Sequence, residues 1–255
     1  MELIEHGVTN LANSYPDNSC PVRPHKRKAR VLLTVECLAF CFQDDFLKIL
    51  LFKGDCKELS KWSFAYVTVG ESESPDDTAQ RLMYNSTGIS TTFLEQLHTR
   101  DGVIKSPGER VVSITFIALL DASRPDKSVD ACLEGHWFTL DKMPKLRHDQ
   151  RETVNSAINH LRYKAALHPL LFELLPERFT LPQIQNLYDS VYNAHIDKRN
   201  LSKRILSTGL LIKTPEKDKS SKKGASYYCL NKTLYNPRSL SLIKLLPNLH
   251  TFTGR

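Results

Sequence analysis

Acidic side chains gather in residues 71–77, and an arginine follows them at Arg81. Carboxylate oxygens are the ligands that Mg²⁺ prefers in proteins, and bound ions of this kind assist the hydrolysis of diphosphates. Beyond Arg81, however, Leu82 offers no oxygen, and Asn85 and Ser86 offer only weak neutral ones. A helix with these residues lacks the several carboxylates that a catalytic metal ion needs.

The segment from Trp62 to Ile89 resembles the Nudix box of pyrophosphohydrolases, whose pattern is G-x5-E-x7-R-E-U-x-E-E-x-G-U, with U apolar. The first glycine of that pattern falls on Val67, and its metal-binding glutamates fall on Leu82, Asn85 and Ser86. The resemblance implies a Nudix scaffold without its metal site, so we expect neither an enzyme nor a bound metal or cofactor. A divergent hydrolase that uses the acidic segment is the alternative. The matched positions are Glu73, Arg81, Met83, Gly88 and Ile89.

Strands and helices of an α/β sandwich are predicted on both sides of this segment. Runs rich in β-branched and aromatic residues predict strands, and an apolar stripe at helical spacing predicts a helix. Pro75 and two acids open the helix of the box, because proline and negative charge suit a first turn, and Gly88 ends it. The predicted strands are 31–42, 46–52, 92–97, 111–120 and a short one at Trp137-Phe138, and a second helix spans 149–166.

A second, smaller unit begins after Pro169 and has the order of a winged helix-turn-helix. Two helices are separated by a short turn at His195-Ile196. Asp197 is a suitable N-cap for the second helix, and Gly209 stops it. A charged, serine-rich loop between two strands is typical of a wing. The predicted elements are helices 181–193 and 197–209 and strands 210–214 and 225–231.

The net charge of +7 is concentrated at one end of the chain. Residues 190–255 carry 13 lysines and arginines against three acids, a net of +10, so the remaining 189 residues carry a net of −3. A mildly acidic body with a strongly basic second unit predicts contact with a polyanion, and double-stranded DNA suits a winged helix. A protein-interaction module with a solvated basic surface is the other interpretation.

Basic and amide side chains on the second helix are the expected DNA contacts. Leu201, Ile205 and Leu206 can face the core, which leaves the polar residues on the N-terminal and outward surfaces. Arginine and asparagine can bond guanine and adenine bidentately, whereas lysines in the wing suit phosphates. The expected contacts are Lys198, Arg199, Asn200, Ser202, Lys203 and Arg204 in the helix, Lys217, Lys219, Lys222 and Lys223 in the wing, and Thr180 and Gln183 at the start of the first helix.

The run Asp197-Lys198-Arg199-Asn200 and its flanking positions are similar to the C-terminal domain of the Nudix-related transcriptional regulators of the NrtR type. Proteins of this bacterial family are dimeric DNA-binding repressors or activators. Their Nudix domain senses ADP-ribose or related nucleotides in some branches and a pentose in others. The resemblance implies a homodimer with a small-molecule effector. Because no apolar run approaches the ~18–20 residues needed to span a membrane, we expect a cytoplasmic protein without membrane contact. The resemblance covers roughly residues 31–230, and further matched positions include Phe172, Pro176, Phe179, Gln185, Tyr188, Lys203 and Leu210.

Charged and aromatic side chains near the box are the candidates for the effector pocket, namely Glu36, Lys53, Tyr66, Glu73, Arg81 and Arg110. Arg81 can hold an anionic ligand bidentately, but a structural ion pair with Glu73 that closes the loop–helix motif is the alternative. The family usually has a glycine pair where this chain has Tyr66 and Val67. Bulky residues there narrow the space for a diphosphate.

The predicted fold combines the α+β and α/β classes: a Nudix-like α/β/α sandwich followed by a winged helix-turn-helix domain. The expected boundaries are a flexible arm at 1–29, an effector-binding domain at 30–166, a DNA-binding domain at 167–235 and a tail at 236–255. Six cysteines without metal-ligand spacing predict free thiols. The N-terminus lacks the pattern of a secretory signal.

Overall fold

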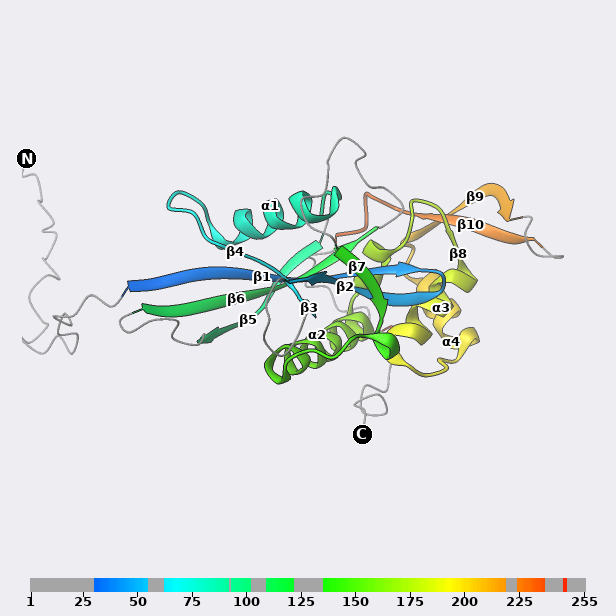
Figure 1. Ribbon diagram of the computed structural model, residues 1–255. Helices are drawn as coiled ribbons and strands as arrows, with labels where there is room; N and C mark the ends of the chain where they lie inside the picture. Colours follow the sequence, from blue (N-terminus) through cyan, green and yellow to red (C-terminus); the bar gives the residue numbers. More distant parts are fainter. Residues whose placement is uncertain are drawn as a thin grey trace, which may run out of the picture.

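A mixed sheet with one helix on each face forms the first part of the molecule, and the winged helix lies at one end of that sheet (Figure 1). The computed structural model describes residues 30–54, 62–91, 93–101, 109–121, 135–218, 224–236 and 245–246. The expected arm at 1–29 and most of the expected tail lie outside these ranges. The architecture is the predicted α/β/α sandwich followed by a winged helix-turn-helix.

None of the helices in the described part of the chain is long and apolar enough to cross a membrane.

Strand β1 (Arg30–Gln43) is at the centre of the sheet. It pairs in parallel with β6 (Glu109–Leu120) and antiparallel with β2 (Phe46–Lys53), which follows it across a two-residue turn. Asp44 and Asp45 form this turn with φ values of 54 and 64, the left-handed backbone that such a hairpin requires. The remaining strands are β3 (Trp62–Ser63), β4 (Ala65–Thr68), β5 (Phe93–Asp101) and β7 (Gly135–Thr139), in the order β3-β2-β1-β6-β5 with β4 beside β1 and β7 beside β2.

Alternation of side chains along β1 separates two apolar cores. Cys37 packs in one core with Met83 of helix α1 (Pro75–Thr87), whereas Phe40 packs in the other on the side of helix α2 (His148–Leu167). Helix α1 begins and ends as predicted, with Pro in its first turn and Gly88 at its C-cap with φ 66. The two faces of the sheet are therefore closed by different helices, and a ligand on one face does not touch the other.

Strand ends are where the sequence prediction was wrong. Strand β5 extends to Asp101 and β6 begins at Glu109, so the predicted loop 99–110 is strand at both of its described ends. Pairing with the long strand β6 extends β5 through polar residues that have no strand pattern of their own. The two-residue β3 and the four-residue β4 were not predicted, because such short strands show no periodicity.

The winged helix contains the two predicted helices and the predicted hairpin. Its three-stranded sheet has the order β8-β10-β9. Thr180 and Asp197 cap α3 and α4, and Gly209 follows α4 with φ 72. The elements are η1 (Leu140–Lys142) before α2, then η2 (Leu170–Leu174), β8 (Phe179–Thr180), α3 (Leu181–Tyr192), α4 (Lys198–Ser207), β9 (Leu211–Asp218) and β10 (Ala225–Leu230).

One continuous core joins the sheet to the winged helix. Phe40 and Leu47 of the sheet belong to the same cluster of buried side chains as Tyr188 of α3. At its edge the backbone N–H of Leu47 donates to Ser190 Oγ at 2.7 Å. Leu245 and Leu246, which the sequence placed in a tail, are buried in this core. The two units therefore share their interior rather than meeting through a solvated linker.

The turn between α3 and α4 is held by one carboxylate. Asp189 Oδ1 accepts from Gln185 Nε2 and from the backbone N–H of Ile196, both at 2.8 Å. Asp189 Oδ2 lies 3.2 Å from His195 Nδ1. These contacts fix the direction in which α4 leaves the turn, so Asp189 sets the geometry of the helix-turn-helix.

We expect Asp189→Ala to lower the free energy of unfolding by about 1–3 kcal/mol, because the Ile196 N–H loses its acceptor and the buried Gln185 amide loses one of its two. Urea unfolding of the full chain measures this. Glu152→Ala is the control, since Glu152 is exposed and its contact with His148 is long, at 3.7 Å. This substitution is expected to change the free energy of unfolding by less than about 0.5 kcal/mol. Equal effects of the two substitutions would contradict the role given to Asp189.

Candidate sensor site and nucleic-acid interface

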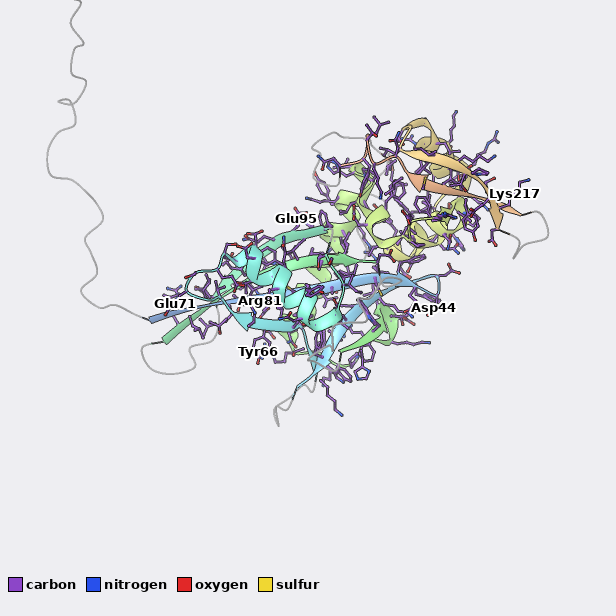
Figure 2. All side chains as sticks on the ribbon, turned by 90° about the horizontal axis from the view of Figure 1, so that it is seen from above. Asp44, Tyr66, Glu71, Arg81, Glu95 and Lys217 are labelled. Carbon is purple, nitrogen blue, oxygen red and sulfur yellow. The ribbon has the colours of Figure 1, made fainter. Side chains whose placement is uncertain are left out.

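Glu73 and Arg81 form a bidentate ion pair at the start of the box helix. Arg81 Nε donates to Glu73 Oε1 at 2.6 Å and Nη2 donates to Oε2 at 2.7 Å, while Thr78 Oγ1 donates to Oε2 at 3.0 Å. The guanidinium of Arg81 lowers the pKa of Glu73 to about 2. Figure 2 shows Arg81 on helix α1, on the side of the sheet that this helix covers. The pair closes the loop onto the helix, which agrees with the structural alternative rather than with an anion-binding arginine.

The helix face where Nudix enzymes carry glutamates is largely buried here. Leu82 is 7% exposed and packs in the α1 core, and Ser86 is also buried, while Asn85 is exposed. In the described ranges no group of three or more His, Cys, Asp or Glu side chains could hold a metal ion. This surface therefore offers packing in place of a carboxylate cluster.

A polar network lies on the opposite face of the sheet, under the N-terminal end of α2. Arg100 Nη2 donates to Glu36 Oε2 at 3.1 Å, and Arg100 Nη1 donates to the backbone carbonyl of Asp149 at 3.2 Å. Partial burial opposes ionisation of Asp149, but its bidentate contact with Arg147 outweighs this and lowers the pKa of the carboxyl group. The network ties strands β1 and β5 to the start of α2.

Polar groups without partners lie on the same face. Thr34 Oγ1 and Ser113 Oγ are 2.8 Å apart, so these two hydroxyls are hydrogen-bonded to each other. Thr115 Oγ1 and Gln150 Oε1 are buried and make no hydrogen bond within the described part of the chain. Buried polar atoms without partners are costly unless a water or ligand satisfies them, so this face is the better candidate for binding a polar molecule.

The six expected effector residues do not form one pocket. Tyr66 pairs with Glu36 in register on the α2 face, with its side chain 62% exposed. Lys53 is exposed at the end of β2. Arg110 is bonded to Asp101 at 2.6 Å near the far ends of β5 and β6. Glu36 and Tyr66 thus lie on one face of the sheet, and the Glu73–Arg81 pair lies on the other.

Arg100 is the residue of the polar network that the sequence analysis missed. Its strand was predicted to end at residue 97, so Arg100 was assigned to a loop. The length of β6 could have indicated that β5 continues through Arg100, because β6 pairs with β5 as far as Asp101.

Helix α4 presents a basic and amide surface to solvent. Lys198, Arg199, Asn200 and Lys203 are exposed, whereas Leu201 is buried as predicted. The Asn200 backbone N–H donates to Asp197 Oδ1 at 2.7 Å, which caps the exposed end of the helix. Ser202 and Arg204 are half-buried. The prediction that Leu206 faces the core was wrong, since this side chain is 44% exposed.

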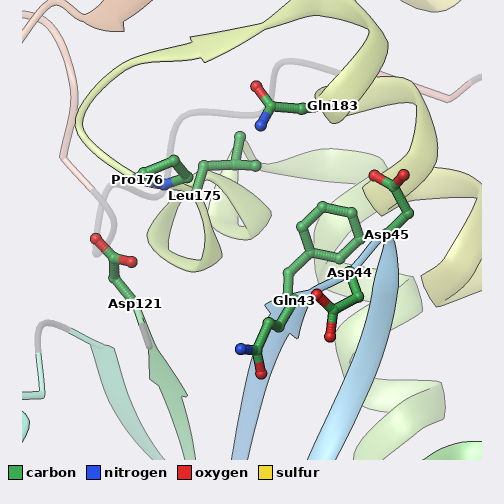
Figure 3. A pocket seen from close by; sticks show the side chains of 8 residues that line it. Gln43, Asp44, Asp45, Asp121, Leu175, Pro176 and Gln183 are labelled. Carbon is green, nitrogen blue, oxygen red and sulfur yellow. The ribbon is translucent and has the colours of Figure 1, made fainter. Parts of the chain in front are cut away.

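Thr180 and Gln183 have a structural role at the start of α3. Thr180 is 4% exposed, and its hydroxyl accepts from the Gln183 backbone N–H while Gln183 Oε1 accepts from the Thr180 backbone N–H. The expected contact of Thr180 with DNA is therefore replaced by a capping box. Gln183 borders a cavity of about 340 Å³ with Asp44, Asp45 and Asp121 (Figure 3). Three carboxylates beside Gln183 disfavour a phosphate there.

The wing presents Lys217 at the far end of the molecule from the box helix (Figure 2). Lys217 is exposed on β9, and the neighbouring Glu216 pairs with Arg178 at 2.6 Å, which joins the wing to the segment before α3. The other expected wing contacts, Lys219, Lys222 and Lys223, lie outside the described residues. Lys217 and the N-terminal part of α4 are the basic surface that the structure describes.

Comparisons with known proteins agree with this arrangement. The family model of the NrtR DNA-binding winged helix domain matches residues 171–230. The ADPR responsive transcriptional repressor NtrR of Acinetobacter baylyi is 24% identical over 202 residues, which cover 77% of this chain and 81% of that protein.

Solved structures share the fold. NrtR of Shewanella oneidensis is 25% identical with a TM-score of 0.69, covering 83% of this chain and 99% of that one. The same protein complexed with a 27mer DNA has a TM-score of 0.70 at 24% identity, covering 82% of this chain and 98% of that one. A MutT/nudix family protein from Enterococcus faecalis has a TM-score of 0.63 at 20% identity, covering 82% of this chain and 91% of that one.

The matched winged helix carries the exposed basic helix α4, and the matched sheet carries the box helix with its Glu73–Arg81 pair. The chain therefore resembles NrtR in fold: a Nudix-like α/β domain precedes a winged helix whose residues 171–230 match the NrtR DNA-binding winged helix domain.

Proposed function

We propose that this protein is a bacterial transcriptional regulator that acts in the cytoplasm. It binds operator DNA through helix α4 and the wing, and it senses a small metabolite with its Nudix-related domain. The observation that carries the proposal is the capped, solvent-exposed basic end of α4 in an NrtR-type winged helix that shares its core with the sensor sheet.

DNA recognition is assigned to the first two turns of α4. Arg199 and Asn200 follow the Asp197 cap and are exposed, which is where a recognition helix meets base edges. Lys198, Lys203 and Lys217 supply exposed positive charge for phosphates, which position the protein without reading sequence.

The effector site is assigned to the α2 face of the sheet, beside Glu36 and Arg100. The unpartnered buried oxygens of Thr115 and Gln150 lie there beside the Glu36–Arg100 pair, which is joined by a single side-chain contact, whereas Arg81 holds Glu73 bidentately. Since the Acinetobacter relative is named for its response to ADP-ribose, we propose a metabolite of the ADP-ribose or sugar type. Tyr66 borders this face and would favour the smaller members of that class, because it replaces a glycine of the family.

The box is assigned a scaffold role without catalysis. Leu82 and Ser86 are buried at positions where Nudix enzymes hold metal ions through glutamates. We therefore expect no Mg²⁺-dependent turnover of ADP-ribose or of nucleoside diphosphate sugars, and measurable turnover would establish the hydrolase alternative instead.

We further propose that the regulator is a homodimer, with a sensor domain at 30–166 and a DNA-binding domain at 167–235. The proposed boundary falls at the last residue of α2, Leu167. Light scattering and limited proteolysis would test these assignments.

Fluorescence anisotropy at about 150 mM salt, where weak non-specific binding is largely suppressed, tests the central proposal. The probe is the duplex upstream of the operon that encodes the protein, and a shuffled duplex is the control. A preference of about a thousandfold supports sequence-specific regulation. Equal, weak and steeply salt-dependent binding to both duplexes would refute it.

Arg199→Ala is expected to weaken operator binding by about 1–3 kcal/mol and to reduce discrimination between operator and shuffled DNA, because a bidentate base contact is lost. The same anisotropy assay measures both effects. Arg110→Ala is the matched control, because Arg110 is an exposed arginine paired with Asp101 on the sensor sheet, away from α4 and the wing. Retained affinity and discrimination in Arg199→Ala would remove Arg199 from the recognition set.

Arg81→Gln is expected to raise the pKa of Glu73 from about 2 toward its usual value of 4.5. A folded-state pKa below the unfolded value stabilises the protein above the unfolded pKa, and the effect is lost as the pH falls through the folded pKa. The stability difference between the wild type and Arg81→Gln should therefore be present above about pH 4.5 and vanish toward pH 2. NMR titration of the Glu73 carboxyl, with Arg110→Gln as control, checks this. An unchanged Glu73 pKa in Arg81→Gln would contradict it.

A further inference from the structure

An open crevice of about 950 Å³ lies where the sheet, helix α2 and the winged helix meet. The end of the β1–β2 hairpin, the segment after β7, one face of α2 and the C-terminal half of α3 line it. Small-molecule sites have volumes of about 300–1,000 Å³ and occur preferentially between domains. In the described part of the chain, none of the residues assigned to the effector or to DNA lines this crevice.

Three carboxamide side chains line the crevice; two of them are exposed and the third is half-buried. Asn155 lies on α2, Asn186 lies on α3, and Asn193 is the left-handed C-cap of α3. None of the three side chains makes a hydrogen bond to another described residue. A carboxamide both donates and accepts, which matches the hydrogen-bonding capacity of a hydroxyl group.

The charged groups of the crevice select against an anionic ligand. Arg151 and Arg162 line it from α2, but Asp45, Asp141 and Asp189 line it as well. The carboxylates outnumber the guanidinium groups, so a phosphate or carboxylate gains no net attraction there. An uncharged ligand avoids this repulsion and can still use the donors and acceptors.

An apolar floor completes the crevice. Phe46 is 55% exposed beside it, and Leu140, Met143 and Ile158 are further lining residues. An exposed aromatic ring offers a flat apolar surface. Such a surface suits the C–H face of a sugar ring or the plane of a nucleobase.

We propose that this crevice binds an uncharged, hydroxyl-rich molecule, either a free sugar or the ribose of a nucleoside. The site is separate from the effector site on the sheet. Because α2 and α3 both line it, the bound molecule bridges the two units. A ligand that contacts both helices stabilises the arrangement of the two units to which it binds.

Saturation-transfer NMR on the full-length protein tests the proposal, with D-ribose and adenosine as probes. Asn155→Leu and Asn186→Leu, on two different helices, each remove one hydrogen-bonding side chain. Each variant is expected to weaken probe binding about three- to tenfold. Asn85→Leu makes the same chemical change on α1, across the sheet, and is expected to leave probe binding unchanged. Thermal unfolding confirms that the three variants are folded.

Binding of both probes indicates a site for the sugar itself, and binding of adenosine alone indicates a nucleoside site. No binding of either probe at millimolar concentration would overturn the proposal. Binding that is indifferent to Asn155→Leu and Asn186→Leu, or that is weakened equally by Asn85→Leu, would place the probe elsewhere and would also overturn it. Operator binding by the same variants without any probe is expected to equal that of the wild type, so failure here is distinct from failure of the proposed regulator.

Discussion

Burial of aromatic and leucine side chains between the α2 face of the sheet and the winged helix is the interaction on which the rest of the molecule depends. Phe40, Phe172 and Tyr188 lie in one cluster that crosses between the two units. Each such side chain contributes about 1.5–3 kcal/mol when it is removed from water. Because close-packed cores deform little, the orientation of α4 is coupled to the sheet by packing. A flexible linker between the units would not give this coupling.

Helix α2 connects the two ends of this arrangement. Its first turn is bonded to Arg100 through the Asp149 carbonyl, and near its other end Arg162 Nε donates to the Val191 carbonyl at 2.8 Å. A helix of 20 residues is about 30 Å long. A change at Glu36 and Arg100 therefore has a rigid element through which it can reach α3. The proposed crevice lies along the same helix and would act on the same element.

The sequence was a good guide wherever local chemistry decides the structure. Pro75 and Gly88 bound α1, and Asp197 and Gly209 bound α4, because caps and left-handed turns are properties of a few adjacent residues. The ion pair of Glu73 with Arg81 could be anticipated for the same reason, since Glu73 lies just before α1 and Arg81 lies within its first two turns.

Features that depend on distant pairing were harder to predict. Arg100 meets Glu36 only because β6 lies between their strands, and no spacing along the chain reveals that. The division of the effector candidates between two faces follows from strand register, which composition does not specify. Thr180 with Gln183 three residues later is the sequence pattern of a capping box at the start of a helix. The prediction assigned both residues to DNA contacts instead.

The position of Leu246 has a consequence for the order in which the protein matures during synthesis. Its backbone N–H donates to the Ala166 carbonyl, and its side chain and that of Leu245 are buried in the core that both units share. The central parallel pair of β1 with β6 already requires contacts across long sequence separations, which form slowly. A nascent chain can complete this core only after residue 246 has left the ribosome. A truncated chain that contains all of α4 but ends before residue 245 therefore carries this helix on an incomplete core.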